Sequence, residues 1–583
     1  MSDTNWSVDA FRRGETPLPT PNRGWNTYGR GVESVGRDAA PEPIEIPTPR
    51  PDQLLIRIDA VGLCFSDVKL INLGNEHPKL RGRDLATDPT RLGHEASVTV
   101  IEVGDDLADT YRPGQRLAIQ PDIHVDGVST AYGYSIPGGL IQYHLIGPEV
   151  LDADDGAYVI PLDDSLSYAA AALSEPWACV EASYTQRRRL EPLDGGIMWI
   201  IGSADDPAVY EASRGLDAPA TIVLSDVSPQ ARALVEQHLR PDATILTENG
   251  IEPSGYDDLV ARHSPDHGFD DIIVLDPRSA EVVENAARHI AFRGTMNLVG
   301  RTPLDRHPEL DVGRLHYHYT AYVGTTGPDL AAAYGEARNR ADLRPGGVAV
   351  YIGGAGPMGQ MHMQRALEMD DGPALLVGSD LDDERLAAAN DFLADLAAEK
   401  GRELVFVNPS TGDESLVELV GRLTDGRGAD DVIVSVPSGP VMADAAALLA
   451  PDGMFVAFAG VANGTMAPLN ASDVYLANAQ FTGTSGSNIA DQASVIEKAV
   501  SGALSPERSL AAVGGIEAGQ EGLRAMIEGR YAGKIMIFPQ LSGLPLTGLA
   551  ELAAEHPEIE AAMKDGTWTV EAENALLRAY ASA

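Results

Sequence analysis

The spacing of apolar and polar residues divides the chain into a β-rich opening and a longer region where strands and helices alternate. Within about the first 190 residues, apolar runs such as 54–58 and 117–120 are separated by Pro and Gly turns, which is typical of strands joined by tight connections. Beyond them, strand-length apolar runs alternate with amphipathic stretches, which predicts parallel βαβ units. The expected fold class is α/β with a β-rich domain in front.

The alternating region contains five segments that occur twice in the same order. The matching pairs are 190–202 with 343–354, 224–230 with 378–384, 268–277 with 428–437, 293–300 with 452–460, and 323–337 with 482–499. Because five ordered matches are hard to produce by chance, we infer a duplication and expect two tandem Rossmann-like, doubly wound parallel-sheet domains. The predicted domains are 1–190, 191–340 and 341–500. Residues 501–583 would return to the opening domain and end in a helical tail for packing or oligomer contacts.

The second copy carries a loop suited to a dinucleotide. The apolar strand 348–352 runs into a glycine-rich turn, and a helical stretch begins at once. Glycines at the first, third and sixth positions allow a tight bend, the approach of a pyrophosphate, and close packing of helix on strand. The turn consists of Gly354, Ala355, Gly356, Pro357, Met358 and Gly359.

The next strand of this copy ends in Asp380. An acid at this place can accept hydrogen bonds from the ribose hydroxyls and repel a 2′-phosphate, which favours NAD over NADP. Arg385 follows closely enough to keep NADP open as an alternative. We assign Asp380, Arg385 and Val436 to the cofactor site together with the turn.

The corresponding turn of the first copy, 202–207, keeps one glycine and places Asp205 and Asp206 where phosphate would bind. Such carboxylates suit a helix N-terminus, and Pro207 suits a first helical position. Asp226 persists at the place of the ribose acid. We predict that this copy is degenerate and binds no dinucleotide, and that it serves as a built-in partner of the second copy or as a wall of the substrate cleft.

Composition limits the classes of function. The formal net charge of −43 argues against nucleic acid and anionic membranes as partners. No apolar run reaches the length of a membrane span or a secretory leader, so a cytoplasmic location is expected. The two cysteines, Cys64 and Cys179, exclude a disulfide framework and a zinc site built from several thiolates.

Groups suited to a metal stand in three separate segments. Cys64 follows a strand, His94 and Glu95 come thirty residues later, and Glu175 precedes a proline. A thiolate, an imidazole and carboxylates around an open position are typical of a catalytic zinc site. Cys179, at helical spacing from Glu175, is expected in the core.

These segments resemble those of the zinc-dependent medium-chain dehydrogenases/reductases, especially their alcohol and sorbitol dehydrogenase-like and sugar-phosphate reductase-like branch. The resemblance covers about residues 40–190 and 341–540. It implies a GroES-like zinc catalytic domain at 1–190 and an NAD-binding Rossmann domain at 341–500.

The resemblance also implies roles for individual residues. Cys64 and His94 would bind one zinc ion per chain. Glu95 and Glu175 would each bind the metal or hold its water, and the sequence does not decide which is the third ligand. Ser66 would lie near the substrate oxygen as the first proton exit.

Four features depart from the family pattern. The four-cysteine structural zinc lobe is absent, and 122–139 runs in its place. Lys69 stands where a proton-relaying histidine is common, and is either a second proton exit or a solvated cation. Val98 replaces a glycine, and the Rossmann domain is duplicated.

The expected chemistry is hydride transfer from a secondary alcohol of a polyol, sugar or sugar derivative to NAD. Zinc lowers the pKa of a bound alcohol, and the resulting alkoxide expels a hydride. One alternative is a lyase or epimerase that uses tightly bound NAD for transient oxidation of a sugar. Another is a non-catalytic binding or scaffold protein derived from such an enzyme.

The substrate is a small molecule that the sequence does not name. Lys79, Arg81 and Arg83 gather positive charge between two metal-ligand segments of a very acidic chain. They could hold a phosphorylated or acidic substrate. They could equally form a solvated loop paired with Asp84 and Asp88.

Overall fold

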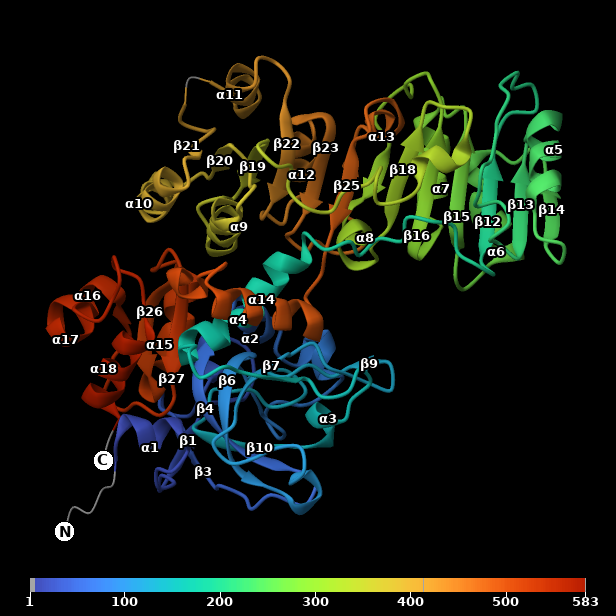
Figure 1. Ribbon diagram of the computed structural model, residues 1–583. Coiled ribbons are helices and arrows are strands. Elements are labelled where there is room, and N and C mark those ends of the chain that lie inside the picture. Colours follow the sequence, from blue (N-terminus) through green and yellow to red (C-terminus); the bar gives the residue numbers. More distant parts are fainter. Residues whose placement is uncertain (1–5, 413, 582–583) are drawn as a thin grey trace, which may run out of the picture. The chain divides into compact units, whose positions relative to one another are not determined.

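The structure is a computed structural model that describes residues 6–412 and 414–581. It contains two compact units, one built from 1–182 and 486–583 and the other from 183–485. The first unit is β-rich and the second consists of parallel sheets flanked by helices (Figure 1), so the predicted fold class is confirmed. Among the described residues, no helix has the length and apolar character that crossing a membrane requires.

An eight-stranded, mainly antiparallel sheet forms the core of the first unit. Its central strand β4 (Leu54–Gly62) is buried along its whole length, and pairs with β6 (Glu95–Val103) and β27 (Lys534–Phe538). The end of β4 lies beside the start of β6 and the middle of β27, so segments far apart in the sequence meet there. The other strands are β7 (Arg116–Ile119), β10 (Tyr143–Ile146), β11 (Val159–Pro161), β26 (Leu510–Gly515) and β28 (Thr547–Gly548).

Helices of this unit carry or support the candidate site residues. α2 (Phe65–Leu73) follows β4 directly, and α4 (Tyr168–Ala182) packs against β4, β6 and α14 (Ile489–Ser501). The other helices are α1 (Val8–Arg12), α3 (Pro148–Leu151), α15 (Gly519–Glu528), α16 (Leu549–Glu555), α17 (Pro557–Glu560) and α18 (Val570–Tyr580).

The second unit contains two six-stranded parallel sheets with the same strand order. Numbered along each copy the order is 3-2-1-4-5-6, that of Rossmann folds. The first sheet contains β12 (Ile197–Ile201), β13 (Thr221–Ser225), β14 (Thr244–Glu248), β15 (Phe269–Leu275), β16 (Ile290–Val299) and β18 (Ala321–Thr325). The second contains β19 (Val348–Ile352), β20 (Leu375–Ser379), β21 (Glu403–Val407), β22 (Ala429–Val434), β23 (Leu449–Ala457) and β25 (Gln480–Gly483).

Each sheet has its own set of helices. Those of the first copy are α5 (Pro229–His238), α6 (Tyr256–His263), α7 (Ala280–Ala287) and α8 (Val312–Tyr317). Those of the second copy are α9 (Pro357–Glu368), α10 (Asp383–Glu399), α11 (Leu416–Leu423), α12 (Gly439–Ala446) and α13 (Ala471–Leu476).

The two copies share an ion pair between a partly exposed arginine and a buried aspartate at equivalent places. Arg189 contacts Asp271 at 2.8 Å in the first copy, and Arg340 contacts Asp431 at 2.5 Å in the second. In both copies the aspartate sits just after a register shift between the fourth and fifth strands. The same non-local contact in both copies agrees with the inferred duplication.

The copies differ at the loop after their first strand. Between β12 and β13, residues 202–220 contain no helix, so the expectation that Pro207 begins one is wrong. Asp206 instead accepts hydrogen bonds from the Ala208 N–H at 2.9 Å and the Tyr210 hydroxyl at 2.7 Å. Its carboxylate thus closes a local turn. The first copy lacks the helix N-terminus on which a pyrophosphate would rest.

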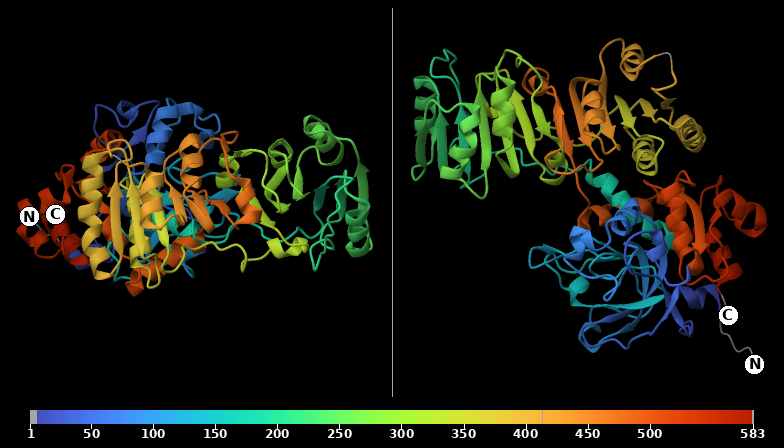
Figure 2. Two further views of the ribbon diagram at one scale, coloured as in Figure 1. Left: turned by 90° about the horizontal axis from the view of Figure 1, so that it is seen from above. Right: turned by 180° about the vertical axis from the view of Figure 1, so that it is seen from behind.

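The copies meet edge to edge at β18 and β25 (Figures 1 and 2). The short strand β17 (Glu309–Asp311) of the first copy pairs antiparallel with β24 (Met466–Pro468) of the second. In addition α13 packs on β18, and α8 packs on β25. The contact is reciprocal, as in a two-fold symmetric dimer. This arrangement favours the built-in partner over the wall of a cleft as the role of the first copy.

Two equivalent glycines make this reciprocal contact possible. Gly324 on β18 lies against Tyr475 of α13, where an added Cβ would come within 2.7 Å of the tyrosine Cβ. Gly483 on β25 lies against the backbone of α8, where an added Cβ would come within 3.0 Å of the Leu315 carbonyl oxygen. Each edge strand therefore needs glycine where the other copy's helix crosses it.

Candidate metal centre and dinucleotide loop

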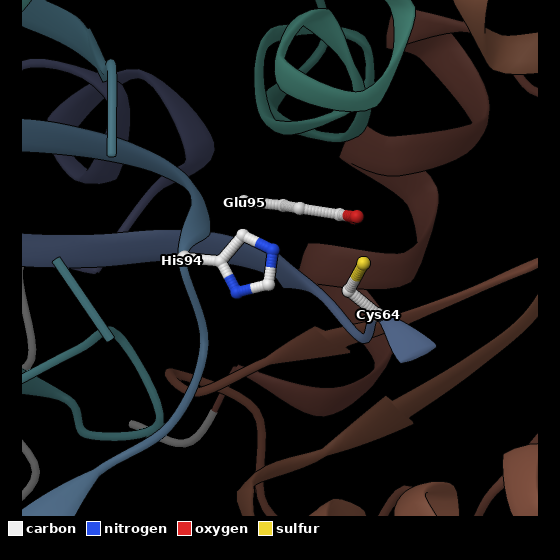
Figure 3. Close-up of side chains that lie close together, drawn as sticks. All are labelled: Cys64, His94 and Glu95. Carbon is white, nitrogen blue, oxygen red and sulfur yellow. The ribbon is translucent and has the colours of Figure 1, made fainter. Parts of the chain in front are cut away.

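Cys64, His94 and Glu95 come together as the sequence predicts. One ligand atom from each lies within 4.8 Å of the others. Figure 3 shows the sulfur, one imidazole nitrogen and the carboxylate directed toward a common point. The cysteine stands between β4 and α2, whereas the other two stand at the start of β6.

Asp67 holds the two ligand segments together. Its carboxylate accepts hydrogen bonds from the Cys64 N–H at 2.9 Å and the Gly93 N–H at 3.2 Å. It also lies 3.4 Å from His94 Nδ1. A carboxylate beside Nδ1 leaves Nε2 for a metal, as is common for histidine ligands.

Glu95 is held by a lysine from a distant strand. Lys534 Nζ on β27 donates to Glu95 Oε1 at 2.5 Å, and both side chains are buried. Although burial opposes it, the charge of Glu95 raises the pKa of Lys534. A Cβ at Gly62 would collide with the other oxygen, Glu95 Oε2, so any larger residue at the end of β4 would displace this carboxylate. These contacts fix the carboxylate beside Cys64.

Glu175 borders the same site from α4. Burial raises the pKa of Glu175 to about 7, while the charge of His94 lowers it and that of Glu95 raises it. A carboxyl group whose ionised form is disfavoured in this way is stabilised as a carboxylate by a nearby cation. Glu175 is therefore the second candidate for a carboxylate ligand.

The C-terminal tail supports the helix that carries Glu175. The buried Glu573 of α18 accepts hydrogen bonds from the Tyr168 N–H at 2.8 Å and the Ala169 N–H at 3.0 Å. These are N-terminal N–H groups of α4, which lack partners within the helix. Packing is thus one role of the tail.

Cys179, which the sequence places in the core, lies beside Glu175 and outside the group of candidate metal ligands. It is partly exposed, and its Sγ lies 3.9 Å from Glu175 Oε1 and 3.9 Å from Ser487 Oγ. Both cysteines of the chain therefore border this region.

The donor groups fit a zinc ion. Among the described residues, Glu95 Oε2 is buried and has no hydrogen-bond partner. A buried carboxylate oxygen without a partner is costly unless a ligand satisfies it. Sulfur, imidazole nitrogen and carboxylate oxygen together form the donor set of catalytic zinc sites.

The two candidate proton exits lie on α2. The Ser66 hydroxyl is 3.5 Å from Cys64 Sγ, so it borders the metal centre. Lys69 is exposed one turn further along the helix. The Tyr134 ring, centred 5.8 Å from the His94 ring, covers another side of the centre.

The predicted basic cluster is divided among different partners. Lys79 Nζ lies 3.2 Å from Asp122 Oδ1 and 5.1 Å from the centre of the Tyr134 ring. Arg81 donates to the Ser129 carbonyl at 2.6 Å, and Arg83 is 3.0 Å from Asp88. Lys79 is the member of the cluster whose described contacts lead toward the metal centre.

The glycine loop of the second copy has the geometry that a pyrophosphate needs. Gly356 is the N-cap residue of α9, which begins at Pro357. A Cβ at Gly354 would lie 2.9 Å from the Gly378 Cα, and a Cβ at Gly359 would collide with the Gly353 carbonyl oxygen. The loop therefore tolerates no side chain at its first and sixth positions.

The remaining predicted cofactor residues surround this loop. Met358 is in the first turn of α9, and Val436 lies against Gly353. Asp380 follows β20 directly, as expected for a ribose-binding acid. Arg385 lies 3.7 Å from Asp382 on its own helix, so its charge already has a neighbouring acid.

Asp226 of the first copy is engaged by its own loop. Its carboxylate accepts a hydrogen bond from the Gly250 N–H at 2.8 Å, and its φ is 50°. Asp380 of the second copy likewise accepts a local N–H, that of Leu381, at 2.8 Å. The two copies therefore differ at the loop after the first strand and not in the contacts of this acid.

Several residues around the site carry no motif. Their partners are far away in sequence, and 439 residues separate Lys534 from Glu95. The residues concerned are Gly62, Asp122, Tyr134, Lys534 and Glu573. Lys534 begins a strand whose other four residues are all apolar, and this position is the one signal in the sequence that could have drawn attention to it.

Comparisons with known proteins support this assignment. The alcohol dehydrogenase GroES-like domain matches residues 50–151, and the zinc-binding dehydrogenase domain matches residues 357–501. The first match contains Cys64, His94 and Glu95, and the second begins within the glycine loop.

Two bacterial relatives span nearly the whole chain. Uncharacterized protein YggP of Escherichia coli is 25% identical over 558 residues, which is 93% of this chain and 95% of that protein. Mannitol-1-phosphate 5-dehydrogenase of Aliivibrio fischeri is 24% identical over 547 residues, covering 92% and 94%. L-sorbose 1-phosphate reductase of Klebsiella pneumoniae is 29% identical over 316 residues, covering 51% and 75%.

The fold is also that of a solved dehydrogenase. The structure of 2R,3R-butanediol dehydrogenase from Bacillus subtilis superposes with a TM-score of 0.50 at 16% identity, over 89% of this chain and 99% of that chain. The chain thus contains an alcohol dehydrogenase GroES-like domain and a zinc-binding dehydrogenase domain. These matches support an oxidoreductase similar to alcohol, polyol and sugar-phosphate dehydrogenases.

Proposed function

We propose that this protein is a zinc- and NAD-dependent dehydrogenase that oxidises a secondary alcohol of a phosphorylated polyol or sugar. The convergence of Cys64, His94 and Glu95 around a buried, unpartnered carboxylate oxygen is the observation that carries the zinc assignment. The names of two relatives, a mannitol-phosphate dehydrogenase and a sorbose-phosphate reductase, support the substrate class.

Different residues of the chain bind the metal, transfer the proton and bind the cofactor. Zinc, when bound by Cys64 and His94 with one of the two glutamates, supplies Lewis-acid chemistry that makes an alcohol easier to deprotonate. Ser66, next to Cys64, accepts the hydroxyl proton and passes it outward. When bound, NAD would supply the hydride acceptor. The loop 354–359 binds its pyrophosphate, and Asp380 binds its ribose.

The two alternatives are not favoured. A lyase or epimerase would return the hydride to the sugar, so nicotinamide absorbance would not change after turnover. A scaffold protein would not need Lys534 and Asp67 to hold the ligand groups in place. The relatives with assigned activities are a dehydrogenase and a reductase.

A panel of polyols, sugar phosphates and sugar acids, assayed by nicotinamide absorbance, tests the function. We expect NADH to accumulate with a phosphorylated polyol in proportion to substrate consumed. Conversion of substrate without net NADH would instead establish the lyase or epimerase reaction.

Asp380→Ala is expected to narrow the preference for NAD over NADP. Charge-assisted hydrogen bonds contribute about 1.5–3 kcal/mol, so the ratio of the two kcat/KM values should change about ten- to hundred-fold. The matched variant Asp226→Ala, in the first copy, should leave the ratio unchanged. A wild-type kcat/KM that is higher with NADP would show that the cofactor assignment is wrong.

A further inference from the structure

The segment that replaces the structural zinc lobe places a tyrosine beside the metal centre. Residues 122–139 contain this tyrosine, Tyr134, and also Asp122. The Tyr134 ring lies beside the His94 ring, and only 8% of the residue is exposed. Tyr134 therefore borders the metal centre, and Asp122 pairs with Lys79 at 3.2 Å.

Lys79 bridges these two side chains. Its ammonium lies over the face of the Tyr134 ring at 5.1 Å and 3.2 Å from Asp122 Oδ1. About a third of each side chain in this ion pair is exposed, so the contact is open to water and to a ligand. An ammonium has three donors, and a single carboxylate leaves some of them for another anion.

His77 also packs against Tyr134, and it stays neutral. Its ring centre is 5.2 Å from the centre of the tyrosine ring, and its Nδ1 accepts the Lys79 N–H at 3.3 Å. Burial lowers the pKa of His77 to about 4, and the charges of Lys69 and Lys79 lower it as well. The positive charge near Tyr134 therefore comes from Lys69 and Lys79.

We propose that Lys79 is the residue that recognises the phosphate of the substrate, with Asp122 as the counter-ion that holds the ammonium in place until the phosphate arrives. This inference rests on the proposed function, because it assumes that the substrate is a polyol or sugar phosphate. A point charge on a flexible stem is a common phosphate ligand. In a chain of net charge −43, an anionic substrate needs such a local cation to approach the site.

The inference narrows the basic cluster to one member. Arg83 is paired with Asp88, and Arg81 with the carbonyl of Ser129. We assign neither arginine to the phosphate. Arg83→Met is the matched control for Lys79→Met, because it removes one positive charge from the same loop.

The kinetic test compares mannitol 1-phosphate with mannitol in wild type, Lys79→Met, Lys79→Arg and Arg83→Met. In Lys79→Met, a charge-assisted contact to the phosphate is lost. The KM for mannitol 1-phosphate should therefore rise about ten- to hundred-fold more than the KM for mannitol. Lys79→Arg should recover part of the difference, and Arg83→Met should show none. Equal effects on both substrates in Lys79→Met, or the larger effect in Arg83→Met, would overturn the inference.

A binding measurement keeps the inference testable without turnover. Calorimetric titration with mannitol 1-phosphate should show binding to wild type and much weaker binding to Lys79→Met. Binding should also be weak in the double variant Lys79→Met/Asp122→Asn, which removes both charges of the ion pair. Unchanged circular dichroism would show that these variants fold. If wild type binds mannitol 1-phosphate through Lys79 but forms no NADH, the proposed oxidation is wrong and the phosphate site stands. If wild type does not bind it, the inference is wrong.

Discussion

Replacing Cys64 by serine is expected to remove zinc and to lower kcat/KM by about a thousand-fold or more. The sulfur lies within 4.8 Å of ligand atoms of His94 and Glu95, so its loss takes the thiolate from a three-residue donor set. Lewis-acid catalysis supplies several kcal/mol of transition-state stabilisation, and each 1.36 kcal/mol is about tenfold in rate. Metal analysis and NADH formation, measured on the same preparation, check both parts of the expectation.

The chain offers a matched control in its other cysteine. Cys179→Ser should retain zinc, because this sulfur lies beside Glu175 and outside the cluster of donor atoms. Glu95→Gln and Glu175→Gln should then show which glutamate is the third ligand, through the larger loss of zinc affinity. Full turnover by Cys64→Ser would contradict the zinc site.

Gly356→Asp is expected to weaken NAD binding about a hundred-fold or more without unfolding the protein. Gly356 has a negative φ and caps α9, and an added Cβ would come no closer than 3.4 Å to the Gly353 carbonyl oxygen. Aspartate is a good N-cap residue, so the fold should tolerate it. Its charge, however, would face the pyrophosphate, and juxtaposed like charges cost several kcal/mol. Calorimetric titration of NAD measures the loss.

Gly356→Asn separates charge from size, because asparagine has the shape and capping ability of aspartate but no charge. It should bind NAD more tightly than Gly356→Asp. Wild type should bind one NAD per chain, and Asp226→Ala in the first copy should leave that number unchanged. Two NAD per chain, or one that remains in Gly356→Asp, would overturn the assignment of the second copy as the sole dinucleotide site.

The duplicated architecture could be predicted because each copy repeats the same apolar strands and turns at nearly constant spacing. The structure repeats the non-local ion pair of Arg189 with Asp271 as Arg340 with Asp431 in the second copy. The loop at 202–220 was mispredicted because Asp206 and Pro207 suit both a helix start and an irregular turn. The hydrogen bond from Tyr210, which selects the turn, has no signature in local sequence.

The candidate metal ligands could be named because their order and flanking residues resemble a known family, and the structure brings Cys64, His94 and Glu95 together. The residues that surround them could not be named from the sequence. Lys534 reaches Glu95 across the sheet, and Glu573 caps α4 from the last helix of the chain. Such contacts depend on strand register and on how the tail packs. The residues of 122–139 were visible only as the absence of a zinc lobe, although Tyr134 borders the centre and Asp122 pairs with Lys79.

Zinc titration of the chelated protein tests the central claim most directly. Chelation should abolish NADH formation while circular dichroism stays unchanged. The sheet that carries the ligands is stabilised by the pairing of its eight strands and not by the metal. Activity should then return in proportion to added zinc and reach its maximum at one zinc per chain. Full activity in protein shown by metal analysis to contain no zinc would contradict the account.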